Sequence, residues 1–181
     1  MQKNYSGIDI SKSDFTGVDV SNCIFNDCTF AESNSQSEFD LDFSSSQMQR
    51  VIMAGLYLNN TIFFEADLSD ACFDGTSFQG VDFSNAILNG ASMIRTDWCS
   101  RIEEVGHWST TLACGAQLVG ANLSDSDLSG VDLTGANLTR AKLSGTDLTG
   151  ADLTDADLTD SDLTGAILVG TIMPDGTIHN Y

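Results

Sequence analysis

The sequence predicts a single all-β solenoid, a rod of short coils stacked on one another. Two observations lead to this fold class. A hydrophobic residue recurs every five positions through most of the 181 residues, and a small residue usually stands two positions before it. Composition favours a folded chain, because ten Phe and many aliphatic residues accompany the acidic ones.

The repeat is most regular in the C-terminal part, where ANLSDSDLSGVDLTGANLTRAKLSGTDLTGADLTDADLTDSDLTG begins at Ala121 and leucines recur from Leu123 to Leu168. A step of five residues turns an α-helix by about 500°, so these leucines would form no stripe on a helix. On a flat strand, an odd step puts successive leucines on opposite faces. A chain that turns a corner once per repeat keeps every leucine inside, which predicts coils with short sides.

The same spacing continues through the middle of the chain with larger central residues. If a coil has four sides, residues 20 apart stack, so Phe43, Phe63 and Phe83 should form one column. Columns of similar shape are what a stacked core needs. The other columns expected on this basis are Met48, Leu68, Leu88 and Met53, Phe73, Met93. A weaker form of the repeat begins the chain, with centres at Phe15, Val20, Phe25 and Phe30.

The stretch ADLTDADLTDSDLTG matches the consensus A(D/N)LXX, and the chain resembles the pentapeptide-repeat family over most of its length. This resemblance implies a right-handed quadrilateral β-helix with four pentapeptides per coil. About seven coils at ~4.8 Å each would give a rod of roughly 35 Å. We therefore predict one domain over residues 1–181.

The repeat spacing is interrupted once near the N-terminus. The number of residues between the centres Phe30 and Phe43 is not a multiple of five, which predicts a loop over about residues 31–42. Loops on a regular scaffold often carry binding residues. Decay of a degenerate repeat is the alternative explanation. The candidate partner-binding residues in this loop are Ser35, Glu38 and Phe39.

A second interruption precedes the regular C-terminal repeats. Glu103, Trp108 and Ala113 stand where leucines are expected, although the spacing is preserved, and we expect a loop over residues 101–113. Decay of the repeat is again the alternative, but apolar residues favour a loop that packs on the rod or on a partner. The candidate partner-binding residues are Arg101, Ile102, Glu103, Glu104, His107 and Trp108.

The segments beside this second interruption suggest a narrower resemblance. MIRTDWCS, GAQLVGANLSDSDLSG and the N-terminal SDFTGVDVSNCIFNDCTF are similar to segments of the quinolone-resistance (Qnr-type) proteins. That resemblance implies a rod with the shape and charge of B-form DNA that binds type II topoisomerases, DNA gyrase above all. The chain ends differently, in a tail over residues 174–181 that begins with the turn-forming Pro174-Asp175-Gly176.

Charge agrees with a polyanion-like surface. The chain has 7 Lys plus Arg against 26 Asp plus Glu, a formal net charge of −19, which disfavours binding to nucleic acid or anionic lipid. From Ala121 to Gly165, nine Asp and two basic residues leave a net charge of −7 over nine repeats. At ~4.8 Å per coil this is roughly one charge per 1.5 Å of axis, close to the ≈ 1.7 Å of duplex DNA.

Individual acidic residues are expected to stack as well. A 20-residue coil puts Asp127 beside Asp147 and Asp132 beside Asp152, and like charges opposed in this way cost stability. The polar positions of any solenoid need soluble residues, and this need alone could explain the aspartates. Asn or Thr would, however, give solubility without the repulsion, which favours retention of the acids for binding. The candidate residues of these acidic faces are Asp127, Asp132, Asp147, Asp152, Asp157 and Asp162.

The sequence contains no recognisable catalytic, cofactor-binding or metal-binding motif. Its two histidines, His107 and His179, fit no catalytic triad, and Cys99, His107 and Cys114 have no standard zinc spacing. We therefore expect no enzyme activity and no cofactor. The five cysteines form no even disulfide framework, and no signal peptide or membrane-spanning run is recognisable, so we expect a cytoplasmic protein.

Two functions follow as hypotheses. The first is a DNA-mimicking protein that binds DNA gyrase or topoisomerase IV and protects or modulates it, as in fluoroquinolone resistance. The second is a scaffold whose faces dock an unrelated protein, since a fold alone does not define a partner. The last coil should expose unpaired backbone edges, through which a homodimer could form.

Overall fold

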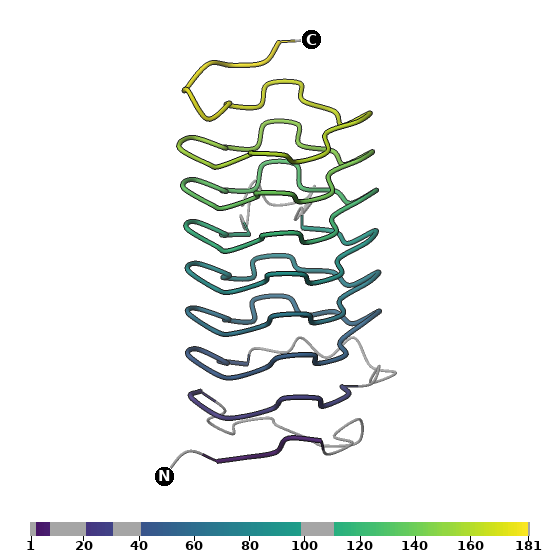
Figure 1. Ribbon diagram of the computed structural model, residues 1–181, viewed down its shortest axis with the longest axis vertical. Helices are drawn as coiled ribbons and strands as arrows, with labels where there is room; N and C mark the ends of the chain where they lie inside the picture. Colours follow the sequence, from purple (N-terminus) through teal and green to yellow (C-terminus); the bar gives the residue numbers. More distant parts are fainter. Residues whose placement is uncertain (1–2, 8–20, 31–40, 99–110, 181) are drawn as a thin grey trace, which may run out of the picture.

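The computed structural model describes residues 3–7, 21–30, 41–98 and 111–180, which form a four-sided β-helix (Figure 1). The N-terminal coil lies at one end of the rod and the C-terminal coil at the other. Each side of a coil pairs through one bridge residue with the coils before and after it, as Ile62 does with Asp42 and Asp82. Within the described residues, the coils therefore pair through isolated parallel bridges, and the bridge between Ile172 and Ile178 near the C-terminus is antiparallel; these residues form no helix and no longer strand.

The bridge residues form four columns, here named faces A to D in the order in which the chain passes them. Successive members are usually 20 residues apart, as predicted from four repeats per coil. Face A carries Asn4, Ile24, Gln47, Asp67, Ile87, Gln117, Asn137 and Asp157, and face B carries Thr29, Ile52, Cys72, Ser92, Asn122, Lys142 and Asp162. Face C carries Tyr57, Ser77, Asp97, Asp127, Asp147 and Ile167, and face D carries Asp42, Ile62, Asp82, Leu112, Asp132, Asp152 and Ile172.

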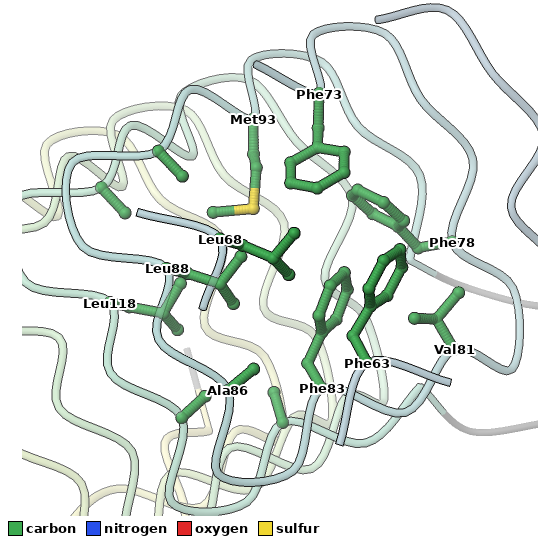
Figure 2. Close-up of a cluster of buried hydrophobic side chains, with 14 of the residues drawn as sticks. Phe63, Leu68, Phe73, Phe78, Val81, Phe83, Ala86, Leu88, Met93 and Leu118 are labelled. Carbon is green, nitrogen blue, oxygen red and sulfur yellow. The ribbon is translucent and has the colours of Figure 1, made fainter. Parts of the chain in front are cut away.

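The core is a set of four stacked columns made by the central residue of each repeat. The ring centroids of Phe43 and Phe63 are 5.4 Å apart and those of Phe63 and Phe83 are 5.2 Å apart, with the planes within 7° of parallel. This confirms the predicted phenylalanine column, part of which Figure 2 shows. The other predicted columns are also confirmed, with 0% exposure for Met48, Leu68, Leu88, Met53, Phe73 and Met93.

Corners between faces need a left-handed backbone at the last position of the repeat. Glycine supplies it with φ of 70° at Gly90, and asparagine, aspartate or arginine supply it elsewhere, as at Asn85 with φ of 56°. At Gly90 a side chain would also collide with its neighbour, because an added Cβ would lie 2.5 Å from Oδ1 of Asp70. The glycine there serves both the backbone angle and the close approach.

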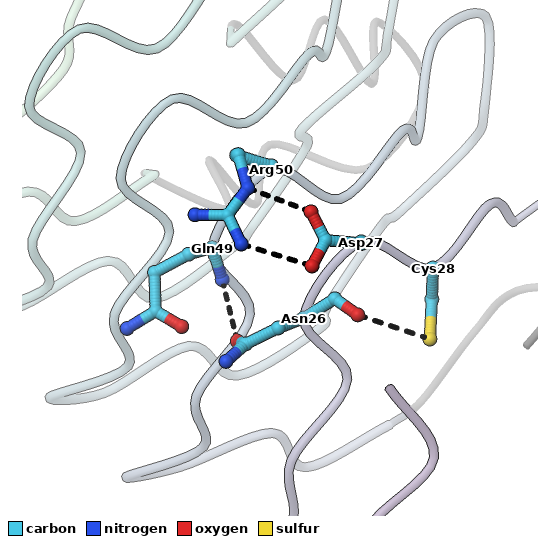
Figure 3. A network of polar contacts seen from close by, with 5 residues as sticks. All are labelled: Asn26, Asp27, Cys28, Gln49 and Arg50. Atoms are coloured by element: carbon cyan, nitrogen blue, oxygen red, sulfur yellow. Dashed lines mark hydrogen bonds and ion pairs between the residues drawn. The ribbon is translucent and has the colours of Figure 1, made fainter. Parts of the chain in front are cut away.

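The first change of register lies between the second and third coils. Ile24 pairs with Gln47, 23 residues later, so three more residues than usual lie between the two bridges. Across this step the Arg50 guanidinium donates to both carboxylate oxygens of Asp27, at 2.6 and 2.9 Å (Figure 3). This hydrogen bonding holds the pKa of Asp27 below its usual value. Because both side chains are exposed, the pair contributes little to the stability of the fold.

The second change of register lies between Trp98 and Thr111. Asp82 pairs with Leu112, 30 residues later instead of 20. Most residues of the two predicted loops, 31–42 and 101–113, lie outside the described residues. Their C-terminal ends are described, and Leu41, Asp42 and residues 111–113 lie in regular coils.

The C-terminal tail folds back on the last coil. After the turn at Pro174-Asp175-Gly176, Ile178 forms an antiparallel bridge with Ile172, and the Gly170 N–H donates to the His179 carbonyl at 2.7 Å. The tail thereby pairs with one side of the coil (Figure 1). In the part of the chain that the structure describes, no helix has the length and apolar character needed to cross a membrane.

Candidate interaction surface

The acidic residues on the faces have a structural role that sequence reasoning missed. Each of the six candidate acids precedes a central residue, and its Oδ1 accepts a hydrogen bond from the backbone N–H two residues later. Asp127 accepts from the N–H of Ser129 at 3.0 Å and from its hydroxyl at 2.6 Å. This is an Asx turn, which explains why Asp or Asn so often stands two residues before Ser or Thr. The same backbone contact is made by Asp132, Asp147, Asp152, Asp157 and Asp162.

The turn itself does not require a negative charge. Asn122 and Asn137 accept the equivalent N–H hydrogen bonds, from Ser124 and Thr139, at 3.2 and 3.1 Å. A neutral amide oxygen therefore closes the corner as a carboxylate does. What distinguishes aspartate from asparagine at the other positions is therefore its negative charge.

Four of the six candidate acids gather on two adjoining faces. Asp127 pairs with Asp147 on face C, and Asp132 pairs with Asp152 on face D. Asp97, which was not among the candidates, extends the face C column by pairing with Asp127 across the second change of register. Neighbours in such a column are about 4.8 Å apart. We name these five residues the acidic patch: Asp97, Asp127, Asp132, Asp147 and Asp152.

The other two candidate acids lie elsewhere on the rod. Asp157 is the last bridge residue of face A, and Asp162 the last of face B. Both are exposed. Asp162 follows Lys142 in its column, so the local charge there is mixed. These two carboxylates do not extend the acidic patch.

Hydrogen bonding lowers the pKa of three of the candidate acids, Asp132, Asp157 and Asp162. Partial burial alone would raise the pKa of Asp132, but hydrogen bonds from Thr134 and from the Cys114 thiol outweigh it and lower that pKa below its usual value. The side-chain hydrogen bond from Thr159 lowers the pKa of Asp157, and that from Thr164 lowers the pKa of Asp162. These carboxylates are therefore negative at neutral pH.

Cys114 contacts the acidic patch but is not poised as a nucleophile or a ligand. Burial, together with the hydrogen bond to Asp132, raises the pKa of its thiol to about 11. It therefore stays protonated at neutral pH. Among the described residues, no three His, Cys, Asp or Glu side chains are arranged to hold a metal ion.

The loop candidates cannot be placed on this surface. Ser35, Glu38 and Phe39 of the first predicted loop lie outside the described residues, and so do the six candidates of the second: Arg101, Ile102, Glu103, Glu104, His107 and Trp108.

A rod with a filled core and its polar side chains on the outside defines a β-helical solenoid protein. The chain belongs to the pentapeptide-repeat family, whose model, "Pentapeptide repeats", matches eight copies over residues 42–80, 76–97, 116–155 and 136–174. The fold is the right-handed quadrilateral β-helix of that family. Such proteins are generally structural or interaction modules without enzyme activity.

Solved structures of other pentapeptide-repeat proteins resemble this one. HetL from the cyanobacterium Nostoc sp. strain PCC 7120, a protein involved in heterocyst differentiation regulation, is 25% identical, with a TM-score of 0.53 over 98% of this chain and 92% of its own. QnrB1, a plasmid-mediated fluoroquinolone resistance protein, is 18% identical, with a TM-score of 0.45 over 91% of this chain and 79% of its own. No curated protein sequence matches the chain.

Proposed function

We propose that this chain is a non-enzymatic binding protein whose acidic patch occupies the DNA-binding surface of a type II topoisomerase, DNA gyrase in the first place, and protects or modulates that enzyme. The observation that carries the proposal is the acidic patch. Four of its five carboxylates, those of Asp127, Asp132, Asp147 and Asp152, close turns that asparagine closes elsewhere in the chain. The carboxylates of the patch also stack on one another at a cost in repulsion. Attraction to a basic surface of the partner would offset this repulsion.

The charge density fits a partner that is built to hold duplex DNA. Net charge over Ala121 to Gly165 is −7, roughly one charge per 1.5 Å of rod axis at ~4.8 Å per coil. Duplex DNA carries one per ≈ 1.7 Å. The choice of gyrase or topoisomerase IV among DNA-binding proteins rests on the Qnr-type resemblance of MIRTDWCS and GAQLVGANLSDSDLSG.

A supercoiling assay tests this proposal. Purified gyrase would be titrated with the protein, with and without a fluoroquinolone. Rescue of supercoiling in the presence of the drug, or inhibition at higher dose without it, is expected. If a folded protein has no effect in either arm, the topoisomerase proposal fails.

Matched charge variants locate the contact. Asp127→Asn with Asp147→Asn removes two charges from the acidic patch, while Asp157→Asn with Asp162→Asn removes two from faces A and B. Net charge is the same in both variants. The first should weaken the effect on gyrase, and the second should leave it near the wild-type level. Equal losses in both variants would assign the effect to net charge and not to the patch.

The second candidate function is a scaffold that docks a partner unrelated to topoisomerases. The similarity to HetL over 98% of the chain favours it, because that protein is involved in heterocyst differentiation regulation. Ionic strength separates the two candidates. Binding through many charge pairs weakens steeply with added salt, whereas an apolar docking contact does not.

We also propose that the protein works in the cytoplasm, where its topoisomerase partner is found, and that it forms homodimers through its C-terminal coil. That coil presents the half-buried Leu158, Leu163 and Leu168 and the exposed Ile167 and Val169, and the described part of the tail pairs with one side of it. Light scattering at high concentration tests the dimer, and a monomer there would remove it.

A further inference from the structure

A half-open hollow of about 620 Å³ lies on face C, next to the acidic patch. It shares one residue with the patch, Asp97, and continues along the same face towards the N-terminal end of the rod. The remaining lining comes from the coil of Asp97 and the two coils before it: Tyr57, Asn59, Gly75, Thr76, Ser77, Gln79 and Arg95.

The hollow arises because side-chain size differs between three successive coils. On face C, Ser77 stands between the larger Tyr57 and Asp97. At the corner between faces B and C, Gly75 precedes Arg95 by one coil, and a Cβ added to Gly75 would meet nothing within 4 Å. On face C the middle coil therefore carries the smallest side chain, Ser77, and the hollow lies there between the larger Tyr57 and Asp97.

Two side chains beside this recess are of the types that dominate protein–protein contacts. Tyr57 is 61% exposed although it occupies a bridge position. Arg95 has neither an ion pair nor a side-chain hydrogen bond to another described residue, whereas Arg50 is paired with Asp27. Exposed Tyr and Arg around a recess are typical of binding hot spots.

The charge of Arg95 is unfavourable for a simple polyanion mimic. A guanidinium beside Asp97 reduces the negative potential at the end of the acidic patch and repels the basic surface of a partner. The positive charge of Arg95 favours binding only if the partner presents an acidic group at this point. Small side chains form the floor of the hollow, and its mouth is open to solvent. This shape suits a protruding side chain or loop of a protein better than a small molecule, which usually binds where most of its surface is enclosed.

From these observations we infer that the hollow is a second contact site for the same protein partner, one that receives a protruding loop with a carboxylate for Arg95. The inference rests on the proposed function, since it deepens the contact with the topoisomerase. The acidic patch then supplies long-range attraction, and the hollow supplies short-range recognition.

Two arginine substitutions test the proposed contact of Arg95. For Arg95→Asn, the change in net charge alone and the loss of this contact predict opposite effects on binding. Arg95→Asn removes the guanidinium, and asparagine is compatible with φ of 56° there, as Asn85 shows with the same angle. Arg140→Asn is the matched control, because Arg140 has φ of 58° at the corner between faces A and B, away from the hollow. Both variants make the chain more acidic by one charge, so charge alone predicts tighter binding for both.

A second pair of variants fills the hollow without changing charge. Ser77→Gln places a longer side chain on its floor, and Ser92→Gln makes the same change on face B. Glutamine already occupies bridge positions at Gln47 and Gln117, so the β-helix accommodates it. Urea midpoints equal to wild type confirm that each variant folds.

The measurement is the Kd of each variant for intact gyrase. Arg95→Asn and Ser77→Gln should each weaken binding about tenfold or more, as expected for a hot spot, with both controls near wild type. If both test variants bind as their controls do while wild type binds, the inference is wrong and the proposed function stands. If wild type itself does not bind gyrase, the proposed function fails and the inference falls with it.

Discussion

Ala113 lies over Phe83 in the core although 30 residues separate them, because Leu112 pairs with Asp82 across the second change of register. The Phe83 N–H donates to the Leu112 carbonyl at 2.7 Å, as in an uninterrupted coil. Ala113 is therefore a true central residue, fully buried but small. Trp98, the last residue described before the step, lies 5.2 Å from Phe83 between ring centroids and is also buried.

We predict that Trp98 fills the space that the small Ala113 leaves in this layer. Trp98→Leu should lower the free energy of unfolding by roughly 2 kcal/mol or more, because it leaves a cavity. Ala113→Leu alone should cost about 1–3 kcal/mol by overpacking. The double variant should lose less free energy of unfolding than the sum of the two single losses, and urea unfolding would measure all three values. Additive losses would show that the two side chains do not share this space.

The turn-closing role of the acids predicts different outcomes for asparagine and alanine. Asp127→Asn with Asp147→Asn should leave the free energy of unfolding unchanged or raise it by up to about 1 kcal/mol, since the turns persist and the repulsion is relieved. Alanine at both positions should lower it by about 1 kcal/mol per lost hydrogen bond. Urea unfolding distinguishes the two. Equal losses for asparagine and alanine would mean that the charge itself supports the fold.

Hydrogen bonds from threonine predict a local pH dependence. The pKa of Asp157 is lowered in the folded state, so its contribution to stability is present above the unfolded pKa of about 4 and is lost as pH falls through the folded value. Thr159→Val removes the largest cause and should raise the pKa of Asp157, measured by carboxyl NMR titration. Asp162 is the internal control, because Thr164 lowers its pKa instead. An unchanged Asp157 pKa in the variant would contradict this cause.

Cys114 offers a chemical probe of the patch. Asp132 helps to raise the pKa of this thiol to about 11, so Asp132→Asn should lower that pKa and speed alkylation by iodoacetamide at about pH 8. Cys72 on face B should react at the same rate in both proteins. A Cys114 rate that does not change, read by peptide mass spectrometry, would rule out the contribution of Asp132.

Much of the fold is predictable because one spacing governs it. A period of five residues fixes which side chains face inward, and a 20-residue coil then places Phe63 between Phe43 and Phe83 as the structure has them. The register across the second interruption was harder to predict. The sequence predicts a loop at Ala113, because a small residue stands there where a leucine is expected, yet backbone pairing at Leu112 keeps Ala113 in the core.

The surface was predictable only in part. Stacking of Asp127 on Asp147 and of Asp132 on Asp152 follows from the coil length alone. Asp97 was missed because the ten additional residues after it conceal its pairing with Asp127. The hollow was missed because it depends on a small residue, Ser77, and small residues give no signal in a sequence until their neighbours are known.

We propose that the acidic patch binds a type II topoisomerase in place of DNA. The most direct test is the Kd of the wild-type protein for intact DNA gyrase, measured from about 50 to 200 mM salt with and without competing duplex DNA. We predict that affinity falls steeply as salt rises and that DNA displaces the protein. Affinity that is independent of salt and of DNA, or no binding by the folded protein, would contradict the claim.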